Sequence, residues 1–132
     1  MKLKFTSIAS VALVLCIGAF TSCFDEAEEE KFTVKVICSG STFNGYIMPD
    51  NEGIAAFSGT DIGSSTFYYE AVYEGLNSLF VSATIPGTVN ASMNIFIYRE
   101  DNKVKEASLS VTTVTTTPST LTLSYDIDES SK

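Results

Sequence analysis

The sequence predicts an all-β protein: a single antiparallel β-sandwich of about seven or eight strands. Three observations support this fold class. Apolar and polar residues alternate with a period of two from Phe32 onward. Turn-forming residues interrupt the alternation at short intervals, and no segment after residue 31 shows the 3.6-residue period of a helix. The roughly 100 residues from Phe32 onward are enough to bury one core.

Two strands and a short apolar segment are expected in the first part of the domain, between residues 32 and 58. In 32–38, the apolar positions include Cys38, which predicts a buried structural thiol. The second strand, 42–48, contains Gly45, a sign of a bulge or of a close backbone contact. The segment 54–58 is short and apolar, and 59–65 has the composition of a loop.

The later strands show longer alternation. In 66–74, aromatic residues occupy both phases, so the pattern does not say which face is buried. After the strand 78–85, the strand 89–99 places Val, Ala, Met and Ile on one face. A polar turn leads into 103–114, and 121–127 closes the pattern. The expected boundaries are a sandwich over 32–128 and a tail over 129–132.

The N-terminal segment has the pattern of a bacterial lipoprotein signal. Lys2 and Lys4 form a basic start, and residues 5–20 carry no charge. This apolar run is shorter than the roughly 20 residues of a membrane span. Ser22-Cys23 follows it, and this arrangement resembles the lipobox of bacterial lipoproteins. The resemblance implies cleavage after residue 22, lipidation of Cys23, and a lipid anchor that holds the protein on a membrane.

A cluster of carboxylates follows Cys23. Like charges this close together favour an extended, solvated tether over 23–31. An acidic cluster at this place also resembles the lipoprotein export signal of Bacteroidota, which implies the outer membrane with the domain facing the cell exterior. The tether alone remains the alternative interpretation. The acidic residues are Asp25, Glu26, Glu28, Glu29 and Glu30.

The domain itself resembles a known family in pattern. The segments 75–83 (GLNSLFVSA) and 94–107 (NIFIYREDNKVKEA) occur behind a lipidated Cys and an acidic tether. Together they are similar to small Ig-like lipoproteins of Bacteroidota related to the MmpS family. The resemblance implies an Ig-like β-sandwich, no catalytic residues, and a role beside an envelope transporter.

Composition excludes several function classes. The chain has no His, which excludes a Ser-His-Asp triad and imidazole-bound metals. Its net charge of −8 disfavours nucleic-acid binding. The evenly spaced carboxylates Glu70 and Glu74 fit a solvent-facing strand better than a catalytic pair. We therefore expect neither an enzyme nor a cofactor.

Two candidate sites remain. Aromatic side chains could form a platform for a sugar ring or a protein partner, because rings bury much area and stack well. The platform candidates are Tyr68, Tyr69, Tyr73, Phe96 and Tyr98. The turn at 50–53 offers Asp50 and Glu52 as weak calcium ligands, although its spacing is not that of an EF-hand.

These observations predict a non-enzymatic outer-membrane lipoprotein that acts as an interaction module. Its expected partners are the membrane, through the anchor, and a protein or glycan in the envelope or outside the cell. A carbohydrate-binding accessory protein and an MmpS-like transporter subunit are the alternatives. A fimbrial subunit would require an incomplete sandwich.

Overall fold

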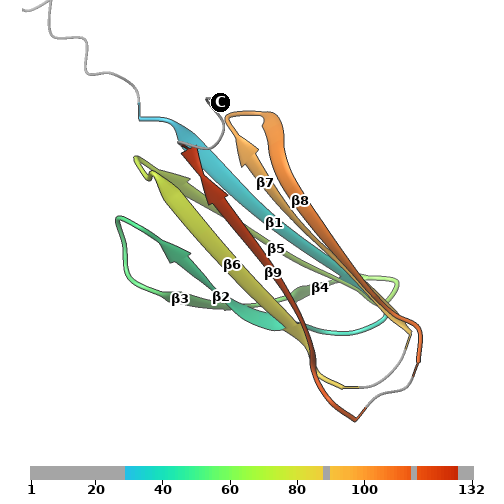
Figure 1. The fold of residues 1–132 in the computed structure, drawn as a ribbon. Coiled ribbons are helices and arrows are strands. Elements are labelled where there is room, and N and C mark those ends of the chain that lie inside the picture. Colours follow the sequence, from blue (N-terminus) through green and yellow to red (C-terminus); the bar gives the residue numbers. More distant parts are fainter. Residues whose placement is uncertain (1–28, 88–89, 114–115, 128–132) are drawn as a thin grey trace, which may run out of the picture.

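The computed structural model describes residues 29–87, 90–113 and 116–127. The described chain is all-β and contains no α-helix, so none that could cross a bilayer. The predicted antiparallel β-sandwich is confirmed (Figure 1). The strands are β1 (Lys31–Ser39), β2 (Asn44–Pro49), β3 (Ala55–Ser58), β4 (Thr60–Gly63), β5 (Thr66–Glu74), β6 (Ser78–Ile85), β7 (Ala91–Arg99), β8 (Asn102–Val111) and β9 (Ser119–Asp126).

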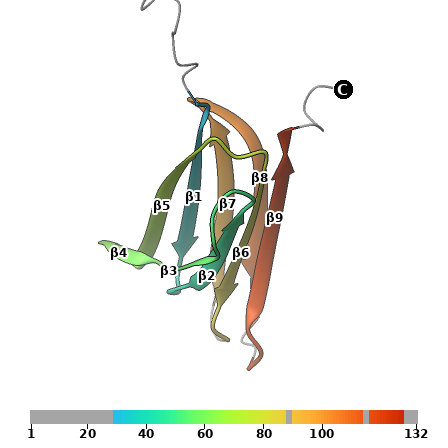
Figure 2. The same cartoon turned by 90° about the vertical axis from the view of Figure 1, so that its left-hand side faces the viewer.

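The strands form two sheets that pack face to face. Sheet A has the order β4-β5-β1-β7-β8, and sheet B has the order β3-β2-β6-β9. All pairings between these strands are antiparallel. Figure 2 shows sheet A and sheet B as two layers, with β8 and β9 on the same side of the sandwich.

The core lies between the two sheets, and β1 runs through its centre. The inward-facing residues of β1, which are Phe32, Val34, Val36 and Cys38, are fully buried because β5 and β7 flank the strand and sheet B covers it. Burial of the Cys38 side chain raises the pKa of its thiol, although the Ser41 backbone opposes the shift. Cys38 is therefore a structural residue, as its phase in the sequence predicts.

The strand count differs from the prediction at one place. The segment 59–65, expected to be a loop, contains β4, in which Thr60 pairs with Tyr68 and the register shifts between Asp61 and Gly63. All four residues of β4 are exposed. A strand without a buried face leaves no alternation in the sequence, so periodicity cannot reveal it.

Candidate functional site

The aromatic residues of β5 and β7 divide between the two faces of sheet A. In β1 the even-numbered residues face the core, so the odd-numbered residues mark the outer face. Tyr68 lies opposite Ile37, and Phe96 lies opposite Lys35. Tyr68, Phe96 and Tyr98 are therefore on the outer face.

The other two platform candidates belong to the core. Tyr73 is buried, and Tyr69 stacks on Phe57 of sheet B with ring centroids 4.3 Å apart. Burial raises the pKa of Tyr73 to about 12, with a further contribution from Tyr69. The prediction that Tyr69 and Tyr73 belong to a ligand platform is therefore wrong. Both phases of β5 carry tyrosine, so the sequence alone could not assign the faces.

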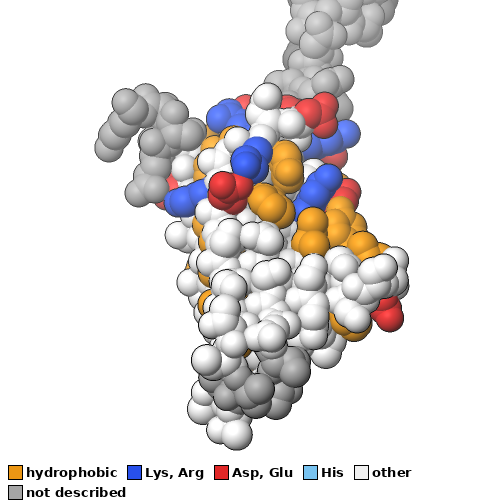
Figure 3. Space-filling model, turned by 90° about the vertical axis from the view of Figure 1, so that its right-hand side faces the viewer, with side chains coloured by type: hydrophobic (Ala, Val, Ile, Leu, Met, Phe, Trp, Pro, Cys, Tyr) orange, Lys and Arg blue, Asp and Glu red, His pale blue; other side chains and the backbone are white. Residues whose placement is uncertain are grey.

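The three outward rings form the centre of an exposed patch, which we call the aromatic patch: Ile37, Tyr68, Val72, Phe96 and Tyr98. Phe96 and Tyr98 lie 6.4 Å apart by ring centroids. The Val72 side chain is 54% exposed, and the others are partly buried by their neighbours. The described strands form two sheets only, so no further layer of strands lies over this face. Figure 3 shows hydrophobic side chains gathered on this face among charged ones.

Two lysines cover rings of the aromatic patch. The Nζ atom of Lys35 lies 5.1 Å from the Tyr98 ring centroid, and that of Lys103 lies 5.8 Å from the Phe96 centroid. Lys35 also pairs with Glu70 at 3.6 Å, and Lys103 pairs with Glu106. Such exposed ion pairs contribute little stability. The two lysines matter for the rings themselves, because each ammonium group occupies one face of a ring.

Tyr68 is the ring of the patch with a fixed hydroxyl group. The hydroxyl donates a hydrogen bond to the Glu70 carboxylate. This hydrogen bond, helped by partial desolvation and the charge of Glu70, raises the pKa of Tyr68 to about 12. Tyr68 therefore stays neutral over the whole physiological range of pH.

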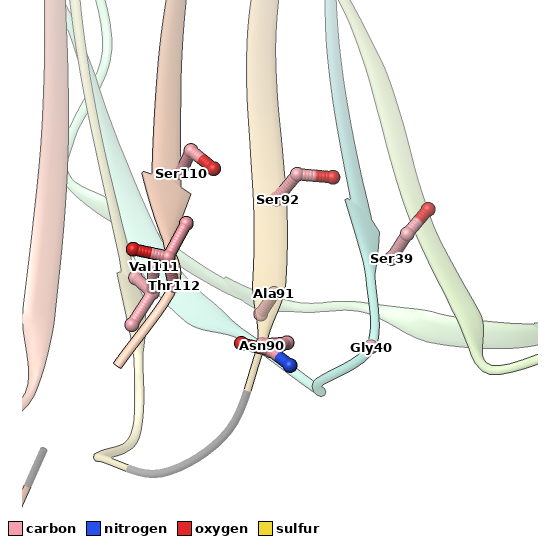
Figure 4. A pocket seen from close by; sticks show the side chains of 8 residues that line it. All are labelled: Ser39, Gly40, Asn90, Ala91, Ser92, Ser110, Val111 and Thr112. Atoms are coloured by element: carbon pink, nitrogen blue, oxygen red, sulfur yellow. The ribbon is translucent and has the colours of Figure 1, made fainter. Parts of the chain in front are cut away.

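The opposite half of the same face is polar and uncharged. Thr66, Ser39, Ser92 and Ser110 are register neighbours on β5, β1, β7 and β8, and they form a row of hydroxyl groups. A shallow hollow of about 350 Å³ lies beside the three serines (Figure 4). It offers hydrogen bonds but no charge and no ring. Its lining is Ser39, Gly40, Asn90, Ala91, Ser92, Ser110, Val111 and Thr112.

A second, smaller apolar surface lies on the outer face of sheet B, and the sequence analysis missed it. Tyr46 is 39% exposed and Met48 is 42% exposed, and the Tyr46 ring lies 6.0 Å from the Phe80 ring. The sequence does contain a sign of this surface. Phe80 shares its phase with Ser78, Ser82 and Thr84, so an aromatic residue stands on an otherwise polar face.

The calcium candidates have other contacts. The Asp50 carboxylate accepts a hydrogen bond from the backbone N–H of Asn77 at 3.0 Å. Partial desolvation opposes ionisation of Asp50, but hydrogen bonds from Asn77 and Ser78 outweigh it and lower the pKa of this carboxyl. Glu52 is exposed in the same turn. Among the described residues, no three acidic or cysteine side chains gather in a way that could hold a metal ion.

The acidic segment meets the sandwich at its last two residues. Glu30 pairs with Arg99, and its carbonyl oxygen accepts a hydrogen bond from Gly75 N–H at 3.3 Å. The Glu29 carboxylate also lies beside Gly75. Glu30 is therefore fixed to the domain, which shortens the expected tether from this end. Cys23, Asp25, Glu26 and Glu28 lie outside the described residues.

Comparisons with known proteins add little to this geometry. No family model and no curated protein match the sequence. A solved structure with a similar chain is the domain of unknown function DUF4425 from Bacteroides vulgatus. It is 12% identical, the match covers 76% of this chain and 96% of that one, and the TM-score is 0.42.

Proposed function

We propose that the chain is an outer-membrane lipoprotein, anchored through Cys23 and facing the cell exterior, whose sandwich binds a protein partner without catalysis. The anchor and the location rest on the sequence of residues 1–30. The binding role rests on one observation, the aromatic patch on the uncovered face of sheet A. Contiguous exposed apolar surface of this kind is typical of interaction sites.

The composition of the aromatic patch favours a protein partner over a sugar. Stacking of a sugar requires a free ring face, and Lys35 and Lys103 lie over the faces of Tyr98 and Phe96. A protein partner can instead add aromatic and charged contacts around the ammonium groups.

A glycan remains the second candidate because of the hydroxyl row. Thr66, Ser39, Ser92 and Ser110 could share hydrogen bonds with a neutral sugar lying across the strands. The transporter-subunit alternative rests on the sequence resemblance alone.

Photo-crosslinking in living cells tests the partner. We expect a photoreactive amino acid at Val72, which belongs to the aromatic patch, to give a protein adduct, because this side chain is the most exposed of the patch. The same group at Met48, on the outer face of sheet B, is the control. Phe96→Ala should abolish the adduct. The absence of any adduct, together with binding of the purified domain to neutral glycans, would favour the second candidate.

Protease shaving of intact cells tests the location. We expect the wild-type protein to be cleaved, and a variant with Asp25, Glu26 and Glu28 replaced by Ala to be protected. Glu30→Ala is the matched control, since it removes an acidic residue that pairs with Arg99. If the wild type is protected while lysed cells are cleaved, the domain faces the periplasm.

A further inference from the structure

The open side of the sandwich, between β8 and β9, carries an inference beyond the proposed function. Sheet A has five strands and sheet B has four. On β7, the inner residues Ala91 to Ile97 are all buried. On β8, the inner residues that pair with them are only partly buried: Lys105, Ala107, Leu109 and Val111. The core is therefore incompletely covered along β8.

The backbone edge of β9 borders this uncovered strip. Ile127 N–H donates to Asn77 O at 3.0 Å, so 77 and 127 form a hydrogen-bonded pair of the antiparallel ladder. The register pairs Ser78 with Asp126, and hydrogen-bonded pairs alternate along a ladder. The backbone groups of Thr120, Thr122 and Ser124 therefore point away from β6, to the edge of sheet B at which no described strand pairs with β9. β8 of the facing sheet comes close to β9 on this side but is not hydrogen-bonded to it as a strand partner. In Figure 2, β9 is the outermost strand on its side.

The other edge strands of the two sheets have features that prevent pairing with a further strand, and β9 lacks these features. β3 and β4 have four residues each, and the register shifts within the β4–β5 pairing. β8 has a register shift against β7, together with Lys103 and the inward-facing Lys105. Short strands, bulges and lysines are the usual devices that prevent edge pairing. The eight residues of β9 pair with β6 without a shift and contain no lysine and no proline.

We infer that the edge of β9 accepts an extended segment of another protein, which adds a fifth strand to sheet B and covers the part of the inner side of β8 that β9 leaves exposed. The added strand would exchange backbone hydrogen bonds with three outward residues of β9, donating to their carbonyl oxygens and accepting from their N–H groups. Its inward side chains, every second residue, would rest on Ala107, Leu109 and Val111, so they are apolar. An acidic residue at one inward position would meet Lys105, which has no ion-pair partner among the described residues. This is recognition by strand addition.

A folded second copy fits this edge less well than a single segment. Its own β9 is flanked by its own β8, which would enter the space beside β8 of the first copy. A single extended segment brings no second sheet with it, so it can pair with β9 without this clash. The geometry therefore favours a segment over the edge strand of a folded second copy.

The test uses the chain from residue 23 with Cys23→Ser and a set of synthetic nonapeptides. The peptides alternate threonine with valine or leucine, with or without a glutamate at one inward position. We expect binding by isothermal titration, weakened about fivefold or more by Thr122→Pro, which removes one outward N–H and leaves the β6 ladder intact. Thr122→Ala keeps the N–H and is the matched control.

Two further comparisons separate the backbone and side-chain contributions. Methylating the peptide nitrogens that face β9 should abolish binding, since side chains are unchanged but the ladder cannot form. Lys105→Met should weaken the glutamate peptide alone.

Failure of every peptide to bind, or binding unchanged by Thr122→Pro, would overturn the inference. A wild-type dimer in sedimentation that Thr122→Pro dissociates would assign the edge to a second copy and overturn the proposed occupant.

Discussion

Gly45→Ala is expected to lower the free energy of unfolding by about 3 kcal/mol. A Cβ atom on Gly45 would lie 2.7 Å from Cζ of Phe57 and 3.0 Å from Cα of Ala83, and closer still to the carbonyl oxygen of Ser82. Two of these neighbours are backbone atoms of β6, so the strand itself must move. Gly45 allows β2 to pair with β6 while the Phe57 ring packs across it.

Gly53→Ala is the matched control for this prediction. No heavy atom lies within 4 Å of a Cβ atom built on Gly53. Both variants add one methyl group, and the two positions are close in the sequence. Urea denaturation followed by tyrosine fluorescence measures the two. Equal stability of the two variants would show that the contact at Gly45 is not as close as described.

The core could be predicted from the sequence because burial leaves a period of two. Phe32, Val34 and Val36 alternate with less buried neighbours, and all three are fully buried. Gly45 was expected to mark a bulge or a close contact, and the second interpretation is correct. The alternation is local, since one strand and its two faces determine it. The glycine marks only that some neighbour comes close, and the sequence does not show that the neighbours are β6 and Phe57.

The candidate site could be predicted only in part, because it depends on which strands become neighbours. Tyr68 and Phe96 come from β5 and β7, which are separated by β1 in sheet A. No pattern within one strand shows that Lys35 would reach the Tyr98 ring. The open side at β8 and β9 was equally hidden, since it depends on the number of strands in each sheet.

Ile97→Ala and Tyr98→Ala are expected to separate stability from binding at two consecutive residues. Ile97 is fully buried on the inner face of β7, and its truncation should lower the free energy of unfolding by about 2–5 kcal/mol, since a cavity remains. Tyr98 is partly exposed on the outer face, where its ring contacts Lys35. Its truncation removes a surface contact of about 0.5–1 kcal/mol.

The expected pattern is therefore a large loss of stability with Ile97→Ala and a small one with Tyr98→Ala, each measured by urea denaturation. The effect on the crosslink from Val72 should be the reverse, under conditions where both variants are folded. Tyr98→Ala should weaken the crosslink, and Ile97→Ala should leave it intact. A large loss of stability with Tyr98→Ala would mean that the ring supports the fold. The aromatic patch would then have a structural role, and the proposed partner site would have to lie elsewhere.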